Sequence, residues 1–153
     1  MSVKLAAIGN VLMGDDGIAI AIAKKIEPEL NRMGIEVVYG ETDVGYCISV
    51  VDASDDIIIL DASAFGKKPG EITRFELTDY EDYSFKSSQH HMNFPYFLKL
   101  YYPGITCHIL AIEVNEVSFQ CGISPVLSDK EEDIGKDILK ILRNVSIFHF
   151  CKG

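Results

Sequence analysis

At 153 residues, with 48% apolar residues, the chain has the size and composition of a single globular domain, which we expect to span residues 1–153. The net charge of −9 disfavours binding to nucleic acid, because most of the surface would repel a phosphate backbone. No apolar run approaches the roughly 18 residues that a membrane span needs, and the apolar run near the N-terminus is too short for a signal peptide. We therefore expect a cytoplasmic protein that binds neither nucleic acid nor a membrane.

The first half of the chain alternates predicted strands and helices. One helix carries Ile18, Ile22, Ile26 and Leu30 on one stripe, and Asp15 or Asp16 is placed to cap it. Pro28 predicts a kink or an early end of this helix. In chain order we predict a strand, a helix, a strand, a short helix and a fully buried strand at residues 3–8, 16–33, 35–39, 44–53 and 56–61.

The second half continues the alternation. Ser128 and Glu131 form a capping box that predicts the start of the last helix. Continuous apolar strands between helices indicate an α/β fold, a three-layer sandwich around a mostly parallel twisted sheet with helices on both faces. In chain order we predict a turn, an edge strand, a polar loop, a helix, a buried strand and a last helix at residues 66–70, 71–77, 78–88, 90–100, 105–114 and 128–145.

Two adjacent carboxylates follow the first strand, in the stretch GNVLMGDDG. The spacing of Gly9 and Gly14 matches a phosphate-binding loop, but Asp15 and Asp16 stand where such a loop needs Lys and Ser or Thr. There is also no GxGxxG motif, so a nucleotide site is disfavoured. One aspartate is enough to cap a helix, so the second is better explained as a residue that contacts a ligand.

A possible divalent metal set consists of Asp16, Asp61 and one of the adjacent histidines, His90 and His91. Asp61 ends a buried strand, and ligands of parallel sheets bind at the carboxyl ends of strands. Carboxylate oxygen and imidazole nitrogen suit zinc, nickel, manganese or iron, and three protein ligands leave a position open for water or substrate. The separations of 45 residues from Asp16 to Asp61 and 29 from Asp61 to His90 match no metal motif, so the residues alone indicate only a possible metal hydrolase.

Taken together, these motifs resemble those of the nickel–iron hydrogenase maturation endopeptidases, closest to the branch that serves hydrogenases of the hydrogenase 3 type. GNVLMGDDG is similar to the family's opening signature, and IIILDAS to its strand-end aspartate motif. SQHHMNFPYFL is similar to its histidine segment, and LAIEVNEVSFQCGISPVLSD to the passage before its last helix. The order of the motifs and the length agree over nearly the whole chain.

The resemblance implies an endopeptidase that removes the C-terminal extension of a nickel-loaded hydrogenase large-subunit precursor, with nickel in the precursor as the recognition feature. It implies that Asp16, Asp61 and His90 are the catalytic and metal-contacting residues, with His91 as an alternative ligand. The nickel would arrive with the substrate, although another divalent metal is also compatible. Asp15 would cap the helix or hold the loop without touching metal. Glu41 and Asp43, where many members carry Gly-Gly-Thr, would add charge near the cleft.

Three other readings remain open on the sequence. The chain could be a non-catalytic chaperone of the same fold that binds nickel or the precursor. It could be a peptidase of this fold whose substrate is not a hydrogenase. It could also be a small α/β nucleotide- or flavin-binding protein, although the absent lysine and GxGxxG motif argue against that.

Overall fold

The computed structural model describes residues 2–79 and 93–144. Its centre is a five-stranded sheet with the order β2-β1-β3-β5-β4. The pairs β1–β2, β1–β3 and β3–β5 are parallel, and β4 is an antiparallel edge strand beside β5. The strands are β1 (Val3–Ile8), β2 (Ile35–Glu41), β3 (Asp56–Ser63), β4 (Ile72–Glu76) and β5 (Thr106–Glu113). The predicted α/β fold with a mostly parallel sheet is confirmed.

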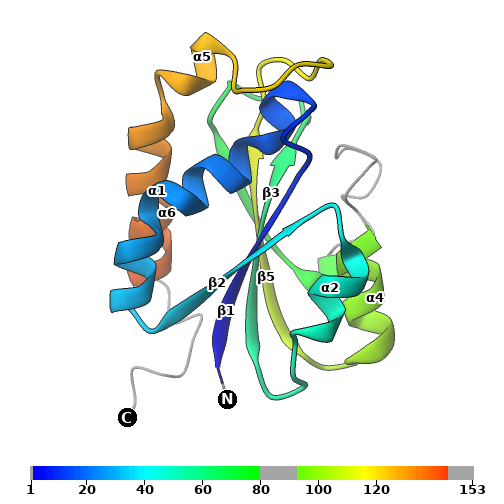
Figure 1. Ribbon diagram of the computed structural model, residues 1–153. Coiled ribbons are helices and arrows are strands. Elements are labelled where there is room, and N and C mark those ends of the chain that lie inside the picture. The colour runs from blue at the N-terminus through cyan, green and yellow to red at the C-terminus, as the bar shows by residue number, and fades with distance from the viewer. Residues whose placement is uncertain (1, 80–92, 145–153) are drawn as a thin grey trace.

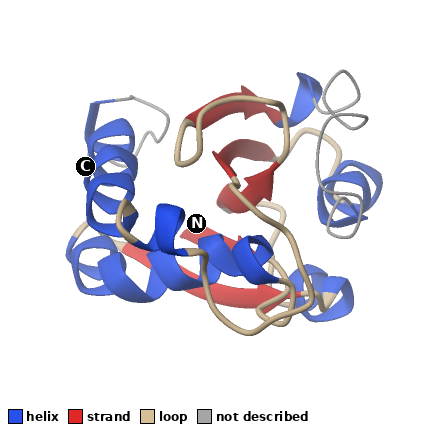
Figure 2. Cartoon of the chain, turned by 90° about the horizontal axis from the view of Figure 1, so that it is seen from above, coloured by secondary structure: helices blue, strands red, loops and turns tan. Residues whose placement is uncertain are grey.

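Helices cover both faces of this sheet (Figures 1 and 2). Side chains of α1 and α6 pack on one face, and side chains of α2 and α4 pack on the other. The α-helices are α1 (Ile18–Arg32), α2 (Val44–Ser49), α4 (Asn93–Tyr101), α5 (Pro125–Ser128) and α6 (Glu131–Asn144). Two short 3₁₀ helices, η1 (Gly14–Gly17) and η2 (Leu77–Asp79), complete the description, and the molecule forms the three layers that the sequence predicts.

The central strand β3 explains why the sheet is covered twice. Every residue of DIIILDAS is buried. Ile58 and Leu60 pack toward α1 and α6, whereas Ile57 and Ile59 pack toward α2 and α4. Each such side chain contributes about 1.5–3 kcal/mol when it is fully buried, so a strand that is apolar on both faces is stable only between two helical layers.

Several helix boundaries differ from the prediction. The helix α1 continues through Pro28 to Arg32, because Pro28 lies on the exposed side, where water can bond to the carbonyl that proline leaves without a helical donor. The predicted capping box at Ser128 is wrong, because Ser128 ends the separate helix α5 and α6 begins only at Glu131. The cap in this region is Ser124, whose hydroxyl accepts a bond from the backbone N–H of Leu127.

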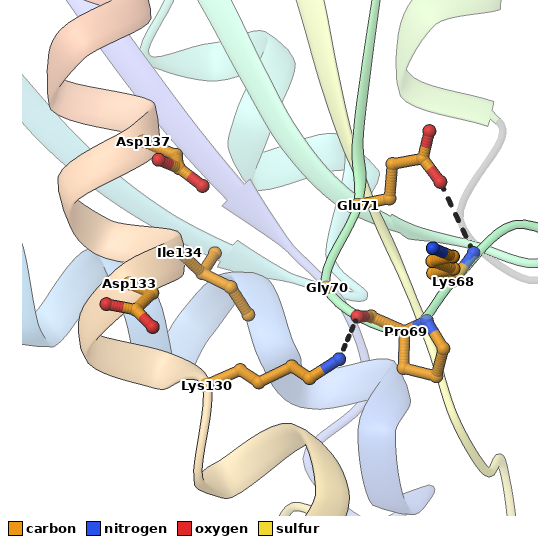
Figure 3. Close-up of a pocket in the computed structure, with 8 residues that line it drawn as sticks. All are labelled: Lys68, Pro69, Gly70, Glu71, Lys130, Asp133, Ile134 and Asp137. Atoms are coloured by element: carbon orange, nitrogen blue, oxygen red, sulfur yellow. Dashed lines mark hydrogen bonds between the residues drawn. The ribbon is translucent and has the colours of Figure 1, made fainter.

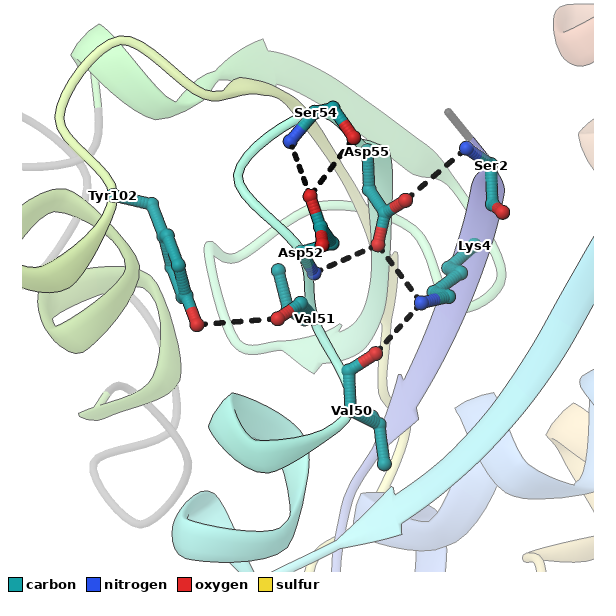
Figure 4. Close-up of polar contacts among 8 residues, drawn as sticks. All are labelled: Ser2, Lys4, Val50, Val51, Asp52, Ser54, Asp55 and Tyr102. Carbon is teal, nitrogen blue, oxygen red and sulfur yellow. Dashed lines mark hydrogen bonds and ion pairs between the residues drawn. The ribbon is translucent and has the colours of Figure 1, made fainter.

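A polar cluster around the buried Asp55 carboxylate closes the amino-terminal end of the sheet (Figure 4). The Asp55 carboxylate accepts hydrogen bonds from Ser2 N at 3.1 Å, Lys4 Nζ at 2.8 Å and Asp52 N at 2.8 Å. Lys4 Nζ also donates to the carbonyl of Val50 at 2.7 Å. These bonds tie the segment after α2 to β1, which is why α2 ends at Ser49 and does not reach residue 53.

None of the helices within residues 2–79 and 93–144 is both long enough and apolar enough to cross a membrane.

Candidate active site

Asp16 lies in the 3₁₀ turn η1, the element that follows β1 at the carboxyl end of the sheet. The backbone of Asp16 packs closely against Gly9, which only glycine permits, because the φ of Gly9 is +150° and a Cβ there would lie 2.2 Å from the Asp16 carbonyl oxygen. The Asp16 side chain is buried, with a residue exposure of 2%, and its Oδ2 accepts a hydrogen bond from Asn10 N at 3.0 Å. The glycine and the aspartate therefore belong to one compact structural unit.

Asp15 has a different role from its neighbour. Its carboxylate accepts four hydrogen bonds from one loop: from Asn115 N at 3.0 Å, Glu116 N at 2.7 Å, Ser124 N at 2.6 Å and Ser124 Oγ at 2.8 Å. The loop at residues 114–124 follows β5, so Asp15 joins the carboxyl ends of β1 and β5. The expectation that Asp15 holds a loop is confirmed, and the loop is one a hundred residues away in the sequence.

Neither aspartate caps α1. Gly17 occupies the N-cap position of α1, and within the described residues no side-chain cap bond is made at this helix start. The prediction that Asp15 or Asp16 caps α1 is therefore wrong. Because η1 occupies Gly14–Gly17, α1 begins at Ile18, two residues after the predicted start at residue 16. Both carboxylates therefore lie before the helix.

Asp61 lies near the carboxyl end of β3 and is also buried, at 7% exposure. It has the same strand parity as Ile57 and Ile59, so its side chain belongs to the face covered by α2 and α4. Its Oδ1 accepts a hydrogen bond from the N–H of Ala62 at 2.8 Å. Two buried carboxylates, Asp16 and Asp61, thus lie at the same end of two adjacent parallel strands.

The third predicted ligand cannot be located in this way. His90 and its alternative His91 both lie outside the described residues. Within residues 2–79 and 93–144, no group of three or more His, Cys, Asp and Glu side chains is arranged to hold a metal ion. Carboxylate oxygens of the kind that Asp16 and Asp61 carry are common ligands of divalent cations.

Another buried carboxylate, Glu113, was not predicted as a site residue. It ends β5 opposite Ser63 of β3. Its carboxylate accepts bonds from Phe65 N at 3.0 Å, from Gly66 N at 3.2 Å and from Ser63 Oγ at 3.4 Å. Glu113 therefore fixes the turn that follows Asp61. The strand-end rule that selected Asp61 would also have selected Glu113, since both are acids at the end of an apolar strand.

The segment after β2 borders the site from the other side. Gly9 N donates to the carbonyl of Glu41 at 3.0 Å, and Glu41 itself has a left-handed φ of 50°. Asp43 caps α2 by accepting a bond from Tyr46 N at 2.9 Å. The two acids predicted near the cleft therefore have different roles. Asp43 caps a helix, whereas Glu41 is an exposed residue whose backbone binds Gly9.

A separate cavity of about 470 Å³ opens between the turn at residues 66–70 and α6 (Figure 3). Lys130 Nζ spans its edge and donates to the carbonyl of Pro69 at 3.0 Å. Charges of both signs line it, from Lys68 and Lys130 to Asp133 and Asp137. This cavity lies on the α6 side of the sheet, whereas Asp61 faces the side of α2 and α4. The cavity is therefore not part of the site that contains Asp61.

Comparison with known proteins gives a consistent result. The family model described as hydrogenase maturation protease (HycI) matches residues 20–141. A "putative hydrogenase maturation protease" of Methanocaldococcus jannaschii is 30% identical over 146 residues, which cover 92% of this chain and 91% of that relative.

Solved structures share the fold. The [NiFe] hydrogenase maturation protease HybD from Thermococcus kodakarensis superposes with a TM-score of 0.75 at 23% identity, over 92% of this chain and 99% of that one. The hydrogenase maturating endopeptidase HybD from E. coli gives 0.73 at 21% identity, over 94% and 93%. With the family model matching most of its length, the chain belongs to the hydrogenase maturation protease family.

Proposed function

We propose that this protein is an endopeptidase that removes the C-terminal extension of a nickel-loaded NiFe hydrogenase large-subunit precursor in the cytoplasm. Nickel in the precursor is the feature that it recognises, and Asp16, Asp61 and His90 contact that metal. The observation that carries the proposal is the pair of buried carboxylates at the carboxyl ends of β1 and β3. Membership of the hydrogenase maturation protease family supports the peptidase activity.

Asp16 and Asp61 each accept a backbone hydrogen bond, and their oxygens are of the type that also binds divalent cations, which supports the proposal that they contact nickel. Asp15 and Glu113 hold the loops around them, which keeps the two carboxylates oriented. Nickel held there would polarise a water molecule or the scissile carbonyl.

In the hydrolysis, water adds its oxygen to the carbonyl carbon and the C–N bond breaks. One of the two carboxylates accepts the proton of the water, and a proton passes to the leaving amine. Asp16 is our choice for this base, because its turn lies at the carboxyl end of the sheet, where ligands of parallel sheets bind.

The direct test is the Asp16→Asn variant, incubated with a nickel-loaded large-subunit precursor and followed by precursor mobility on a gel. We expect the wild-type protein to process the precursor, and the variant to fold but to lose processing by at least about a hundredfold. Asp129→Asn is the control, because Asp129 is exposed at the end of α5, outside β1, η1 and β3. Processing by Asp16→Asn at the wild-type rate would refute the catalytic assignment.

The same assay separates the other candidates. A wild-type protein that binds the precursor without shortening it would be a chaperone, and one that neither binds nor cleaves would act on another substrate. Loss of processing in His90→Ala but not in His91→Ala would assign the imidazole to His90, and the reverse result would assign it to His91.

A further inference from the structure

Exposed apolar side chains gather on the two loops next to the Asp16 turn. Leu12 is 51% exposed and Phe119 is 86% exposed, and Val11 and Val117 are exposed at 41% and 44%. A backbone hydrogen bond joins the two loops, because Gly14 N donates to the carbonyl of Gln120 at 2.9 Å. We call the four side chains Val11, Leu12, Val117 and Phe119 the apolar rim.

A groove of about 240 Å³ runs beside the apolar rim. Apart from the Lys24 side chain, it is walled by aliphatic side chains and glycines. Its lining residues are Val11, Gly14, Gly17, Ile20, Ala21, Lys24, Gly122 and Ile123. Its volume is below the roughly 300–1,000 Å³ typical of small-molecule sites, which suits one aliphatic side chain better than a whole cofactor.

The groove lies on the α1 side of the sheet, opposite to the face of Asp61, and it meets the candidate active site at the η1 turn. Gly14 and Gly17 line the groove, and between them stand Asp15 and Asp16. The Asp15 carboxylate binds the backbone of Asn115 and Glu116, so the loop that carries Val117 and Phe119 is fixed relative to Asp16. A surface fixed in this way loses little conformational entropy when a ligand binds.

We propose that the apolar rim and its groove bind the first residues of the precursor's C-terminal extension, with one aliphatic side chain of the extension in the groove. This inference rests on the proposed function. A peptide that is cut must lie extended at the scissile bond, and an extended chain advances about 3.3 Å per residue. The extension is the part of the precursor that is free to do so, because the other side of the bond belongs to the folded, nickel-bearing subunit. With Asp16 at the scissile bond, the neighbouring residues of the extension pass over the turn that separates Asp16 from the groove.

The test measures steady-state processing of the nickel-loaded precursor by Leu12→Ser and Ala21→Leu. Leu12→Ser removes an apolar contact from the rim, and Ala21→Leu fills the groove from the surface of α1. We expect KM to rise about tenfold in each while kcat stays within twofold, because these contacts bind substrate and transition state alike. Leu100→Ser is the matched control, since Leu100 is 57% exposed on α4 and lies outside the rim. We expect its KM to equal that of the wild type.

Unchanged KM in both rim variants would overturn the inference while leaving the proposed function intact. If the wild-type protein does not cleave the precursor, the proposed function fails, and a fluorescent peptide with the sequence of the extension then tests the surface by anisotropy. Weaker peptide binding in Leu12→Ser and Ala21→Leu, but not in Leu100→Ser, would support the surface, whereas equal binding would overturn it. A wild-type dimer in sedimentation that Leu12→Ser dissociates would also overturn it, because a second copy would then be the occupant.

Discussion

Asp15→Asn tests whether Asp15 joins two parts of the chain that are far apart in sequence. In the structure the Oδ2 atom of Asp15 accepts three hydrogen bonds, from Asn115 N, Glu116 N and Ser124 Oγ, and its Oδ1 accepts one from Ser124 N. An asparagine amide has one oxygen and one NH₂ group. If its oxygen keeps the three bonds of Oδ2, its NH₂ group faces the N–H of Ser124, and that buried donor loses its partner.

The expected loss of stability follows from these bonds. A buried donor left without a partner costs about 1–3 kcal/mol. The bonds that remain lose their charge-assisted part, since bonds to an ionised acceptor are roughly twice as strong as neutral ones. We therefore expect Asp15→Asn to reduce the free energy of unfolding by about 3 kcal/mol. For a protein of this size that lowers Tm by about 6–12 °C.

Thermal unfolding measures this loss, and native-state hydrogen exchange locates it. The amides of Asn115, Glu116 and Ser124 should lose protection, because they donate to Asp15. Asp43→Asn is the control, since Asp43 makes one exposed helix-cap bond that an asparagine oxygen can also accept, so this change should cost less than about 0.5 kcal/mol. A Tm for Asp15→Asn that equals the wild-type value, with protection at the three amides retained, would refute the structural role of Asp15.

Three further outcomes follow from the structure. Burial by itself would raise the pKa of Asp55, but the Lys4 ammonium and two backbone N–H donors hold that pKa below its usual value. The ionised Asp55 therefore stabilises the folded protein above the unfolded pKa of about 3.9. This stabilisation is lost as pH falls through the lower pKa of the folded state. Asp55→Asn should cost about 3 kcal/mol in urea unfolding at pH 7 and flatten the loss of stability below about pH 4, and an unchanged acid profile would contradict this account. Gly40→Ala should destabilise by about 1–3 kcal/mol, because the new Cβ would lie 2.2 Å from Cys47 Sγ, and Cys47→Ala in the same chain should recover part of the loss in thermal unfolding. Burial, and to a smaller extent the nearby Asp43 carboxylate, raises the pKa of the Cys47 thiol to about 11, so mass spectrometry after alkylation at pH 8 should find exposed Cys121 modified before Cys47. Faster labelling of Cys47 than of Cys121 would contradict its burial.

Local patterns in the sequence predicted the elements of the fold well. The first strand was predicted at residues 3–8, and β1 spans Val3–Ile8. The all-apolar run in DIIILD predicted a strand covered on both faces, because only a double covering buries consecutive isoleucines. Helix ends were predicted less well. Ser128 and Glu131 have the spacing of a capping box, but the chain turns between them, and that turn depends on packing that a local pattern does not contain.

For the site, the sequence by itself determined which acids follow the apolar strands, since the end of a parallel strand can be read from local composition. That was enough to select Asp61 and the pair Asp15 and Asp16, whereas the choice of Asp16 within the pair came from the resemblance in motif order that also suggested the family. Only the tertiary structure decided what the neighbouring acids do. Asp15 binds a loop that begins a hundred residues later, and Glu113 holds the turn after a different strand. Hydrogen bonds between segments far apart in the sequence leave no periodic pattern along the chain, because they depend on which strands become neighbours in the folded sheet.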